Sequence, residues 1–167
     1  MRRLMLLRHA KSDWPAGVED HERPLAKRGL RDAPRMGKEM AARGLVPALV
    51  LVSTAMRTRQ TWDLVRPSFG AVAERREKAI YEAQPEAILR VIRATPADMP
   101  SLLVIGHNPG LELTASFLAG DGPQHRALSV KFPTCALAVI DFEAQSWQEI
   151  GQGQGTLALF LTPAGLD

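Results

Sequence analysis

The sequence predicts an α/β fold, a three-layer sandwich around a mostly parallel central sheet of five to six strands. Short apolar runs such as 48–53 and 102–106 have the length and composition of buried strands. Segments with apolar residues at helical spacing alternate with them along the chain. Two consecutive strands near the end, at about 135–142 and 156–162, indicate that one strand is antiparallel.

Each element has a local reason in the sequence. Pro34 lies inside the helical pattern of residues 26–43 and predicts a kink or a break there. The next helix is expected to stop at Pro67 and Gly70, and Pro85 fits the first turn of the helix that follows. The expected elements are, in order, strand 3–8, helix 26–43, strand 48–53, helix 56–67, a short strand within 73–80, helix 85–94, strand 102–106, helix 109–119 and strands 135–142 and 156–162.

The size of the chain predicts a single domain that spans residues 1–167. No segment approaches 18 uninterrupted apolar residues, so we expect no membrane span. The single cysteine, Cys135, excludes an internal disulfide and fits a reducing compartment. Because it lies in an apolar stretch, we expect it to be a buried structural thiol and the protein to be cytoplasmic.

The charge of the chain favours a small anionic ligand over nucleic acid. The formal net charge is only +3, with a pI of about 9.4. There is no dense basic run with interleaved aromatic residues, and the chain has only three Trp, one Tyr and five Phe. We therefore expect no nucleic-acid partner. The arginines are concentrated in four segments, 23–35, 57–66, 75–76 and 90–93.

Polar side chains follow three of the predicted strands, at the point where each strand ends. In such sheets, ligands bind beyond the carboxyl ends of the strands. If the strands are parallel, all three ends face the same edge of the sheet. The three ends are Arg8-His9, Ser53-Thr54-Ala55-Met56-Arg57 and Gly106-His107-Asn108-Pro109-Gly110.

Two of these strand ends open helices. Ser53 or Thr54 is a candidate N-cap for the helix that carries Arg57, and Asn108 is a candidate N-cap for the helix after the third strand. Helix N-termini attract anions through free N–H groups and the helix dipole. With Arg8 and Arg57, whose planar guanidinium groups can each bind two phosphate oxygens, these ends predict a phosphate site.

The two histidines at the strand ends can divide the chemistry of phosphoryl transfer. A neutral imidazole at His9 is a competent nucleophile toward phosphorus. A second imidazole at His107, if protonated near the phosphate, would stabilise charge on the transferring group. No metal-ligand motif occurs at these strand ends, so we expect neither metal nor cofactor. The other histidines, His21 and His125, lie in polar segments and are expected to be exposed.

In these motifs, their spacing and their order, the sequence resembles the histidine phosphatase superfamily over nearly the whole chain, and within it the SixA branch of phosphohistidine phosphatases. The resemblance implies a phosphoglycerate mutase-like fold. The motifs at the strand ends are Leu7-Arg8-His9-Ala10-Lys11-Ser12, the run from Ser53 to Thr61, and Val104-Ile105-Gly106-His107-Asn108-Pro109. Further marks are Trp14, Arg23-Pro24-Leu25, Arg28-Gly29, the run from Gly106 to Glu112, and Lys131-Phe132-Pro133-Thr134.

The resemblance also implies roles for single residues. His9 matches the nucleophile that becomes phosphorylated, and Arg8, Arg57 and His107 match the rest of the phosphate pocket. The candidate for the acidic proton donor of the family is Glu82, although part of the SixA branch is thought to work without a clear acid. Chemistry allows this, because an imidazole leaving group protonated at its distal nitrogen departs neutral and needs less help than an alkoxide.

Three further polar residues are candidates for phosphate contacts, each with a structural alternative. Ser12 and Ser53 could touch the phosphate or merely shape their turns, and Asn108 could bind phosphate or only cap its helix. Lys11 could add positive charge near the site or be solvated. Trp14 is either a packing residue or a platform for the substrate.

The short chain leaves no room for a large insert over the site between residues 54 and 101, and an open site suits a phosphohistidine presented on a protein surface. By resemblance, we expect the partner to be a phosphohistidine carrier such as a histidine phosphotransfer domain, and the product to be inorganic phosphate. One alternative is a general phosphatase for small phosphoesters. Another is a phosphoprotein-binding module with little turnover.

Overall fold

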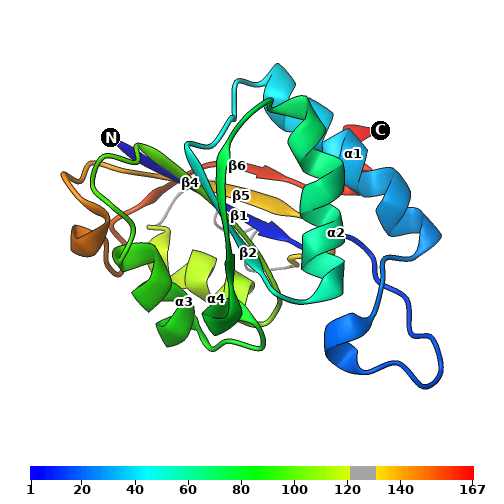
Figure 1. Ribbon diagram of the computed structural model, residues 1–167. Helices are drawn as coiled ribbons and strands as arrows, with labels where there is room; N and C mark the ends of the chain where they lie inside the picture. Colours follow the sequence, from blue (N-terminus) through cyan, green and yellow to red (C-terminus); the bar gives the residue numbers. More distant parts are fainter. Residues whose placement is uncertain (121–130) are drawn as a thin grey trace.

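A six-stranded sheet runs through the middle of the molecule (Figure 1), in the strand order β3-β2-β4-β1-β5-β6. The computed structural model describes residues 1–120 and 131–167. The strands are β1 (Arg2–Arg8), β2 (Leu49–Ser53), β3 (Ala73–Glu77), β4 (Ser101–Gly106), β5 (Leu137–Phe142) and β6 (Thr156–Leu161).

The strand directions confirm the predicted mixed sheet. β1 pairs with β4, β4 with β2, and β2 with β3, all in parallel. β5 is antiparallel to both β1 and β6, so it alone runs against the other strands of the described sheet. The carboxyl ends of β1, β2 and β4 therefore meet at one edge of the sheet, as the sequence predicts.

Helices cover both faces of the sheet, which confirms the three-layer sandwich (Figure 1). One core contains apolar side chains of α1, α2 and one face of the sheet, and the other contains those of α3, α4 and the opposite face. Short 3-10 turns include η1 (Asp20–Glu22) and η3 (Lys78–Ile80). The four α-helices are α1 (Lys27–Ala42), α2 (Met56–Val65), α3 (Pro85–Arg93) and α4 (Gly110–Leu118).

Strand β1 is the central support of the site. Its side chains alternate between the two faces of the sheet, as the pleat requires. Leu4 and Leu6 enter the core under α3 and α4, and Met5 and Leu7 enter the core under α1 and α2. All four are fully buried, so both layers hold this strand up to the point where Arg8 begins the polar segment.

Pro34 lies inside the first helix, where we expected a kink or a break. There is no break, because α1 continues from Lys27 to Ala42. Proline removes the hydrogen bond to the carbonyl four residues earlier, which belongs to Leu30. Because Leu30 is 48% exposed, water can reach this turn and satisfy that carbonyl, which lowers the cost of the proline.

The structure also bears on the single cysteine and on the expected absence of a membrane span. Cys135 is fully buried, as expected, and burial raises the pKa of its thiol to about 12. In the part of the chain that the structure describes, none of the helices is long and apolar enough to cross a membrane.

Candidate functional site

His9 lies directly after β1, and the sheet holds its backbone on both sides. Its N–H donates to the carbonyl of Gly106 (3.1 Å), and its own carbonyl accepts from the N–H of Cys135 (3.0 Å). The residue is only 6% exposed. A group held in this way has little conformational freedom left to lose when a substrate binds.

The hydrogen bonds of His9 decide which ring nitrogen can react. Nδ1 lies 2.7 Å from the carbonyl oxygen of Ala10. A carbonyl only accepts, so Nδ1 carries the proton and Nε2 of the neutral ring carries a free lone pair. Burial, with smaller effects from Arg57 and Arg8, lowers the pKa of His9 to about 3. The imidazole is therefore neutral at physiological pH and has the form that a nucleophile needs.

His107 follows β4, and the centre of its ring lies 5.4 Å from that of His9. Its Nε2 is 2.7 Å from the hydroxyl oxygen of Ser53, which is fully buried. The Ser53 hydroxyl already accepts from the N–H of Ala55 (3.5 Å), so we assign its proton to the bond with Nε2, and the proton of the neutral His107 ring then lies on Nδ1. This Nδ1 is buried and has no hydrogen-bond partner among the described residues. Burial, with smaller effects from His9 and Arg57, lowers the pKa of His107 to about 3.

Two arginines bring positive charge to these histidines. Arg8 donates from Nη1 to the carbonyl of Phe132 (3.2 Å). Arg57, in the first turn of α2, donates from Nη1 to the carbonyl of Asp20 (2.8 Å) and from Nη2 to its carboxylate (3.1 Å). The Nε atoms of both arginines are buried and have no partner among the described residues.

Arg8, Arg57 and His107, which all lie near His9, each keep one buried donor without a partner among the described residues. A buried donor without a partner costs about 1–3 kcal/mol, so a site that keeps three of them is suited to an acceptor that binds there. An oxyanion such as phosphate supplies several acceptor oxygens and negative charge at once. Within residues 1–120 and 131–167, no group of three or more His, Cys, Asp or Glu residues is placed to hold a metal ion.

Asp20 holds Arg57 in position, although no motif in the sequence points to it. Its carboxylate accepts from the Tyr81 hydroxyl (2.6 Å), from Arg57 (3.1 Å) and from Nε of Arg23 (3.1 Å). The hydrogen bond from Tyr81, together with the neighbouring arginines, lowers the pKa of Asp20 to about 2. The Tyr81 ring also lies edge-on to His107, with 5.6 Å between the ring centres. Asp20 therefore joins the loop after β1 to α2 and to the segment after β3.

The sequence and the fold match known proteins. A solved structure from Agrobacterium tumefaciens, assigned as the phosphohistidine phosphatase SixA, has a TM-score of 0.85 to this chain at 34% identity. The alignment covers 97% of this chain and 98% of that one. This chain belongs to the histidine phosphatase superfamily. It falls in the SixA branch, and its sheet has the phosphoglycerate mutase-like arrangement.

Further comparisons agree with this placement. The sequence profile of the histidine phosphatase superfamily (branch 1) matches residues 4–84. The Mycobacterium tuberculosis protein Rv1276c is 37% identical over 161 residues, which cover 94% of this chain and 99% of that protein. A protein histidine phosphatase SixA in complex with tungstate has the same fold, with a TM-score of 0.81 at 22% identity over 99% of both chains. The chain is therefore a phosphatase, a hydrolase that acts on phosphoryl groups.

The candidate Ser12 is used within the chain of this histidine phosphatase. Its hydroxyl accepts from Nη1 of Arg23 (2.9 Å), which also donates to the carbonyl of Asp13 (3.0 Å). The Arg23 guanidinium stacks on the ring of Trp14, 3.5 Å from the ring centre. Trp14 is nevertheless 73% exposed, and Lys11 is exposed as well. These contacts shape the loop between β1 and α1.

The predicted helix caps are wrong for α2. Its N-cap residue is Ala55, with no capping side chain. Ser53 is used by His107 instead, and the Thr54 hydroxyl lies 2.9 Å from Nε2 of His21. The helix begins after both residues, whose side chains contact these two histidines. His21 is consequently half-buried, which corrects the expectation that it is exposed. His125 lies outside the described residues.

Asn108 lies one residue before the position that caps α4, which Pro109 occupies. Its side-chain oxygen still accepts from the backbone N–H of Glu112 (3.3 Å), so it satisfies a donor of the first helical turn. Its amide donates to the carbonyl of Phe132 (2.8 Å), the same carbonyl that holds Arg8. Asn108 therefore links the start of α4 to the arginine of β1.

Glu82, the candidate proton donor, follows Tyr81 on an exposed corner of the chain. Its backbone φ of 51° lies in the left-handed region, which few residues other than glycine adopt. Its carboxylate makes no hydrogen bond or ion pair with the described residues. The structure thus brings His9, Arg8, Arg57, His107 and Ser53 together and leaves Glu82 outside their hydrogen-bond network.

Proposed function

We propose that this SixA-branch phosphatase removes the phosphoryl group from phosphohistidine on proteins, through a covalent phosphohistidine formed at His9. The observation that carries the proposal is the free lone pair of His9 Nε2 among the unpartnered donors of Arg8, Arg57 and His107. The alternative of a binding module with little turnover needs the arginines, but it gives no reason for a neutral, oriented imidazole between them.

In the first step, Nε2 of His9 attacks the phosphorus atom. The new P–N bond forms while the P–N bond to the substrate imidazole breaks, and that electron pair leaves with the substrate nitrogen. Arg8, Arg57 and His107 donate to the oxygens of the transferring group, where charge is concentrated in the transition state. The donors are fixed before the substrate arrives, so little reorganisation is needed.

In the second step, a water molecule attacks the phosphorus of phospho-His9. The P–Nε2 bond breaks, its electron pair returns to Nε2, and one proton of the water is released. Inorganic phosphate leaves and the starting form of His9 is restored. The hydrogen bond from Nδ1 to the Ala10 carbonyl keeps the ring in the same orientation through both steps.

The surroundings of the site favour a leaving group that needs no strong acid. Glu82 is exposed, and the Tyr81 hydroxyl already donates to Asp20. Burial and the bond to Asp20 raise the pKa of Tyr81, so its phenol is a poor proton donor. An alkoxide leaving group would need such a donor, whereas an imidazole protonated at its distal nitrogen departs neutral.

The test is to trap the intermediate. Incubation with a histidine-phosphorylated protein carrying labelled phosphate, followed by an alkaline quench, should leave an acid-labile label on the wild-type chain and none on His9→Ala. The variant should still bind tungstate, because the three donors remain, and this shows that its pocket is folded. Full turnover by His9→Ala would disprove the covalent mechanism.

A substrate panel separates phosphohistidine from small phosphoesters. We expect fast release of phosphate from phosphohistidine and slow release from alkyl phosphates, with little effect of Glu82→Gln on the former. Fast turnover of alkyl phosphates that is lost in Glu82→Gln would instead support a general phosphatase in which Glu82 is the acid.

A further inference from the structure

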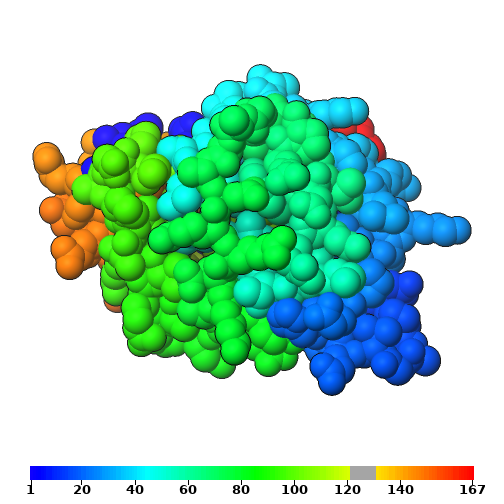
Figure 2. All heavy atoms as spheres, in the orientation of Figure 1, coloured from blue at the N-terminus to red at the C-terminus, as the bar shows by residue number. Residues whose placement is uncertain are grey.

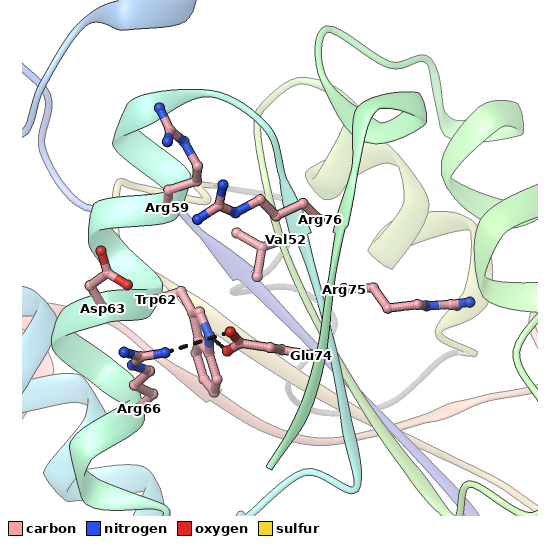
Figure 3. A pocket seen from close by; sticks show the side chains of 8 residues that line it. All are labelled: Val52, Arg59, Trp62, Asp63, Arg66, Glu74, Arg75 and Arg76. Atoms are coloured by element: carbon pink, nitrogen blue, oxygen red, sulfur yellow. Dashed lines mark hydrogen bonds and ion pairs between the residues drawn. The ribbon is translucent and has the colours of Figure 1, made fainter. Parts of the chain in front are cut away.

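A second arginine-rich site lies on the outer face of the molecule, between α2 and the edge strand β3 (Figure 3). It is a groove of about 210 Å³. Val52 and Trp62 form apolar parts of its wall, and the rest of the lining is charged. The lining residues are Val52, Arg59, Trp62, Asp63, Arg66, Glu74, Arg75 and Arg76.

The charges at one end of this groove are paired within the chain. Glu74 on β3 accepts from the indole N–H of Trp62, and its carboxylate lies 3.5 Å from Nη1 of Arg66 (Figure 3). Arg75 points away from α2, to the other side of the strand (Figure 3). This end of the groove therefore has little charge left for a ligand.

At the other end, Arg59 has one long ion pair and Arg76 has none with the described residues. Arg76 points from β3 toward α2 (Figure 3), and it forms no ion pair with the described residues. Arg59 lies in the first turns of α2, and its Nε is buried without a hydrogen-bond partner in the described chain. The carboxylate that it approaches is that of Glu22, at 3.8 Å. Two guanidinium groups that line one groove repel each other unless an anion lies between or beside them.

This end of the groove adjoins the rim of the catalytic pocket. Arg59 follows Arg57 by two residues on α2, and Arg76 is in register with Val52, the residue before Ser53. Glu22 connects the two regions, because it approaches Arg59 and also lies 3.1 Å from Nδ1 of His21. This end of the groove therefore lies toward the carboxyl ends of β2 and β3, the edge of the sheet at which His9 also lies.

The surface beside the groove is open to a macromolecule. In the described sheet, β3 pairs only with β2, so its outer edge is unpaired. Its residues 73–76 are exposed. Figure 2 shows the side chains of β3 and α2 at the surface of the same face of the molecule. A partner that presents a group to His9 can therefore lie across this face as well.

We propose that Arg59 and Arg76 dock acidic side chains of the protein that carries the phosphohistidine, next to the phosphoryl group that it presents. This inference rests on the proposed function. Arginine suits the role because its fork pairs with both oxygens of a carboxylate. Such contacts at the rim of an interface mainly raise the rate of productive encounter and weaken with salt.

The test uses two synthetic phosphohistidine peptides of the same length. One has Asp and Glu residues on both sides of the phosphohistidine, and the other has Asn and Gln in their place. At low salt, the wild-type chain should hydrolyse the acidic peptide with a kcat/KM about 10-fold higher than the neutral one, an effect of the size expected from two exposed ion pairs. The double variant Arg59→Ala/Arg76→Ala should lose this preference, and high salt should abolish it in the wild type.

Free phosphohistidine and a control variant make the outcomes distinguishable. Arg90→Ala removes an exposed arginine on α3, on the opposite face of the sheet, and should keep the preference. Equal rates for both peptides in the wild type, or an unchanged preference in the double variant, would overturn the docking proposal while turnover of free phosphohistidine upholds the proposed function. No turnover of phosphohistidine in any form would overturn the proposed function itself. A dimer that the double variant abolishes would make a second copy of this chain the occupant and would overturn the docking proposal.

Discussion

The substitution Asp20→Asn tests whether the loop after β1 positions the phosphate pocket. One carboxylate oxygen of Asp20 accepts from both the Tyr81 hydroxyl (2.6 Å) and Nη2 of Arg57 (3.1 Å), and the other accepts from Arg23 (3.1 Å). Asparagine has nearly the same shape, but one of its two positions is an NH2 group. Whichever way the amide turns, a donor meets a donor and at least one of these bonds is lost.

The size of the effect on stability follows from the shifted pKa. The pKa of Asp20 lies at about 2, below the ordinary 3.8, so the folded state favours its charged form. One pKa unit corresponds to about 1.4 kcal/mol, but solvent screening reduces this for an exposed group, and the Asp20 side chain is 39% exposed. We therefore expect Asp20→Asn to lower the free energy of unfolding by about 1 kcal/mol at neutral pH. Because the folded-state pKa is lowered, this contribution is present above about pH 4 and is lost as the pH falls toward 2.

The effect on activity should be moderate, because Arg57 keeps its second bond to the Asp20 carbonyl (2.8 Å). We expect kcat/KM for a phosphohistidine peptide to fall about 10-fold, which corresponds to about 1.4 kcal/mol of transition-state stabilisation. Tungstate affinity should fall in parallel, a change that a merely structural role of Asp20 would not produce.

The measurements are steady-state phosphate release, tungstate titration and urea unfolding. The difference in free energy of unfolding from the wild type should stay constant from pH 7 to about pH 4 and narrow as the pH falls from about 4 toward 2. Glu19→Gln, an exposed carboxylate in the same loop, is the matched control. Unchanged kcat/KM and tungstate affinity in Asp20→Asn, or an equal loss in Glu19→Gln, would refute the argument that Asp20 positions Arg57.

Three other predictions follow from the same structure. His9 and His107 have pKa values near 3 when folded, against an ordinary 6.5, so the free energy of unfolding should fall as the pH drops from about 6.5 toward 3. The slope is at most about 1.4 kcal/mol per pH unit for each imidazole, and equal stability in urea at pH 7 and pH 5 would contradict it. Tungstate should bind more tightly at lower pH, because an anion raises the pKa of His107. Calorimetry in buffers of different ionisation enthalpy should detect the proton uptake, and its absence would count against the assigned role of His107. In Gly29→Ala, the new Cβ would lie 2.2 Å from the carbonyl oxygen of Lys11, so the backbone must shift. A shift of about 1 Å this near His9 should lower kcat about 10²-fold. In the control Gly151→Ala, the nearest atom is a side-chain nitrogen at 3.5 Å, and kcat should stay unchanged.

Most of the fold could be predicted from the sequence because the strands differ sharply from the neighbouring segments in their pattern of apolar residues. Strands β1, β2 and β4 are short, continuous apolar runs, and helical spacing fills the segments between β1, β2 and β4. β3 was the weakest prediction, and it was expected only as a short strand somewhere within 73–80. Its sequence, Ala-Glu-Arg-Arg-Glu, has no apolar pattern, because an edge strand is held by its pairing with β2 rather than by burial.

The strand-end residues could be predicted because the topology of a parallel sheet brings them together. Asp20 and Tyr81 could not, since they lie in irregular segments far apart in the sequence and meet only in the folded chain. The N-cap assigned to Ser53 was wrong for a related reason. A serine before a helix commonly caps it, but the tertiary contact with His107 uses this hydroxyl and the helix starts later.

The electrostatics of the site explain why two similar imidazoles can take different roles. Burial, with smaller effects from Arg57 and Arg8, lowers the pKa of both rings, so both are neutral before an anion binds. A bound phosphoryl group adds negative charge that offsets the arginines and favours a proton on each ring. His9 cannot accept this proton at Nδ1, because Nδ1 is already protonated and donates to the Ala10 carbonyl, and its Nε2 forms the bond to phosphorus. His107 can accept a proton at Nε2 by turning Ser53 from donor to acceptor, while Nδ1 still donates to the phosphate. The Ala10 carbonyl thus makes His9 a nucleophile, and the Ser53 hydroxyl allows His107 to stabilise charge. We therefore expect Ser53→Ala to weaken charge stabilisation by His107 more than nucleophilic attack by His9.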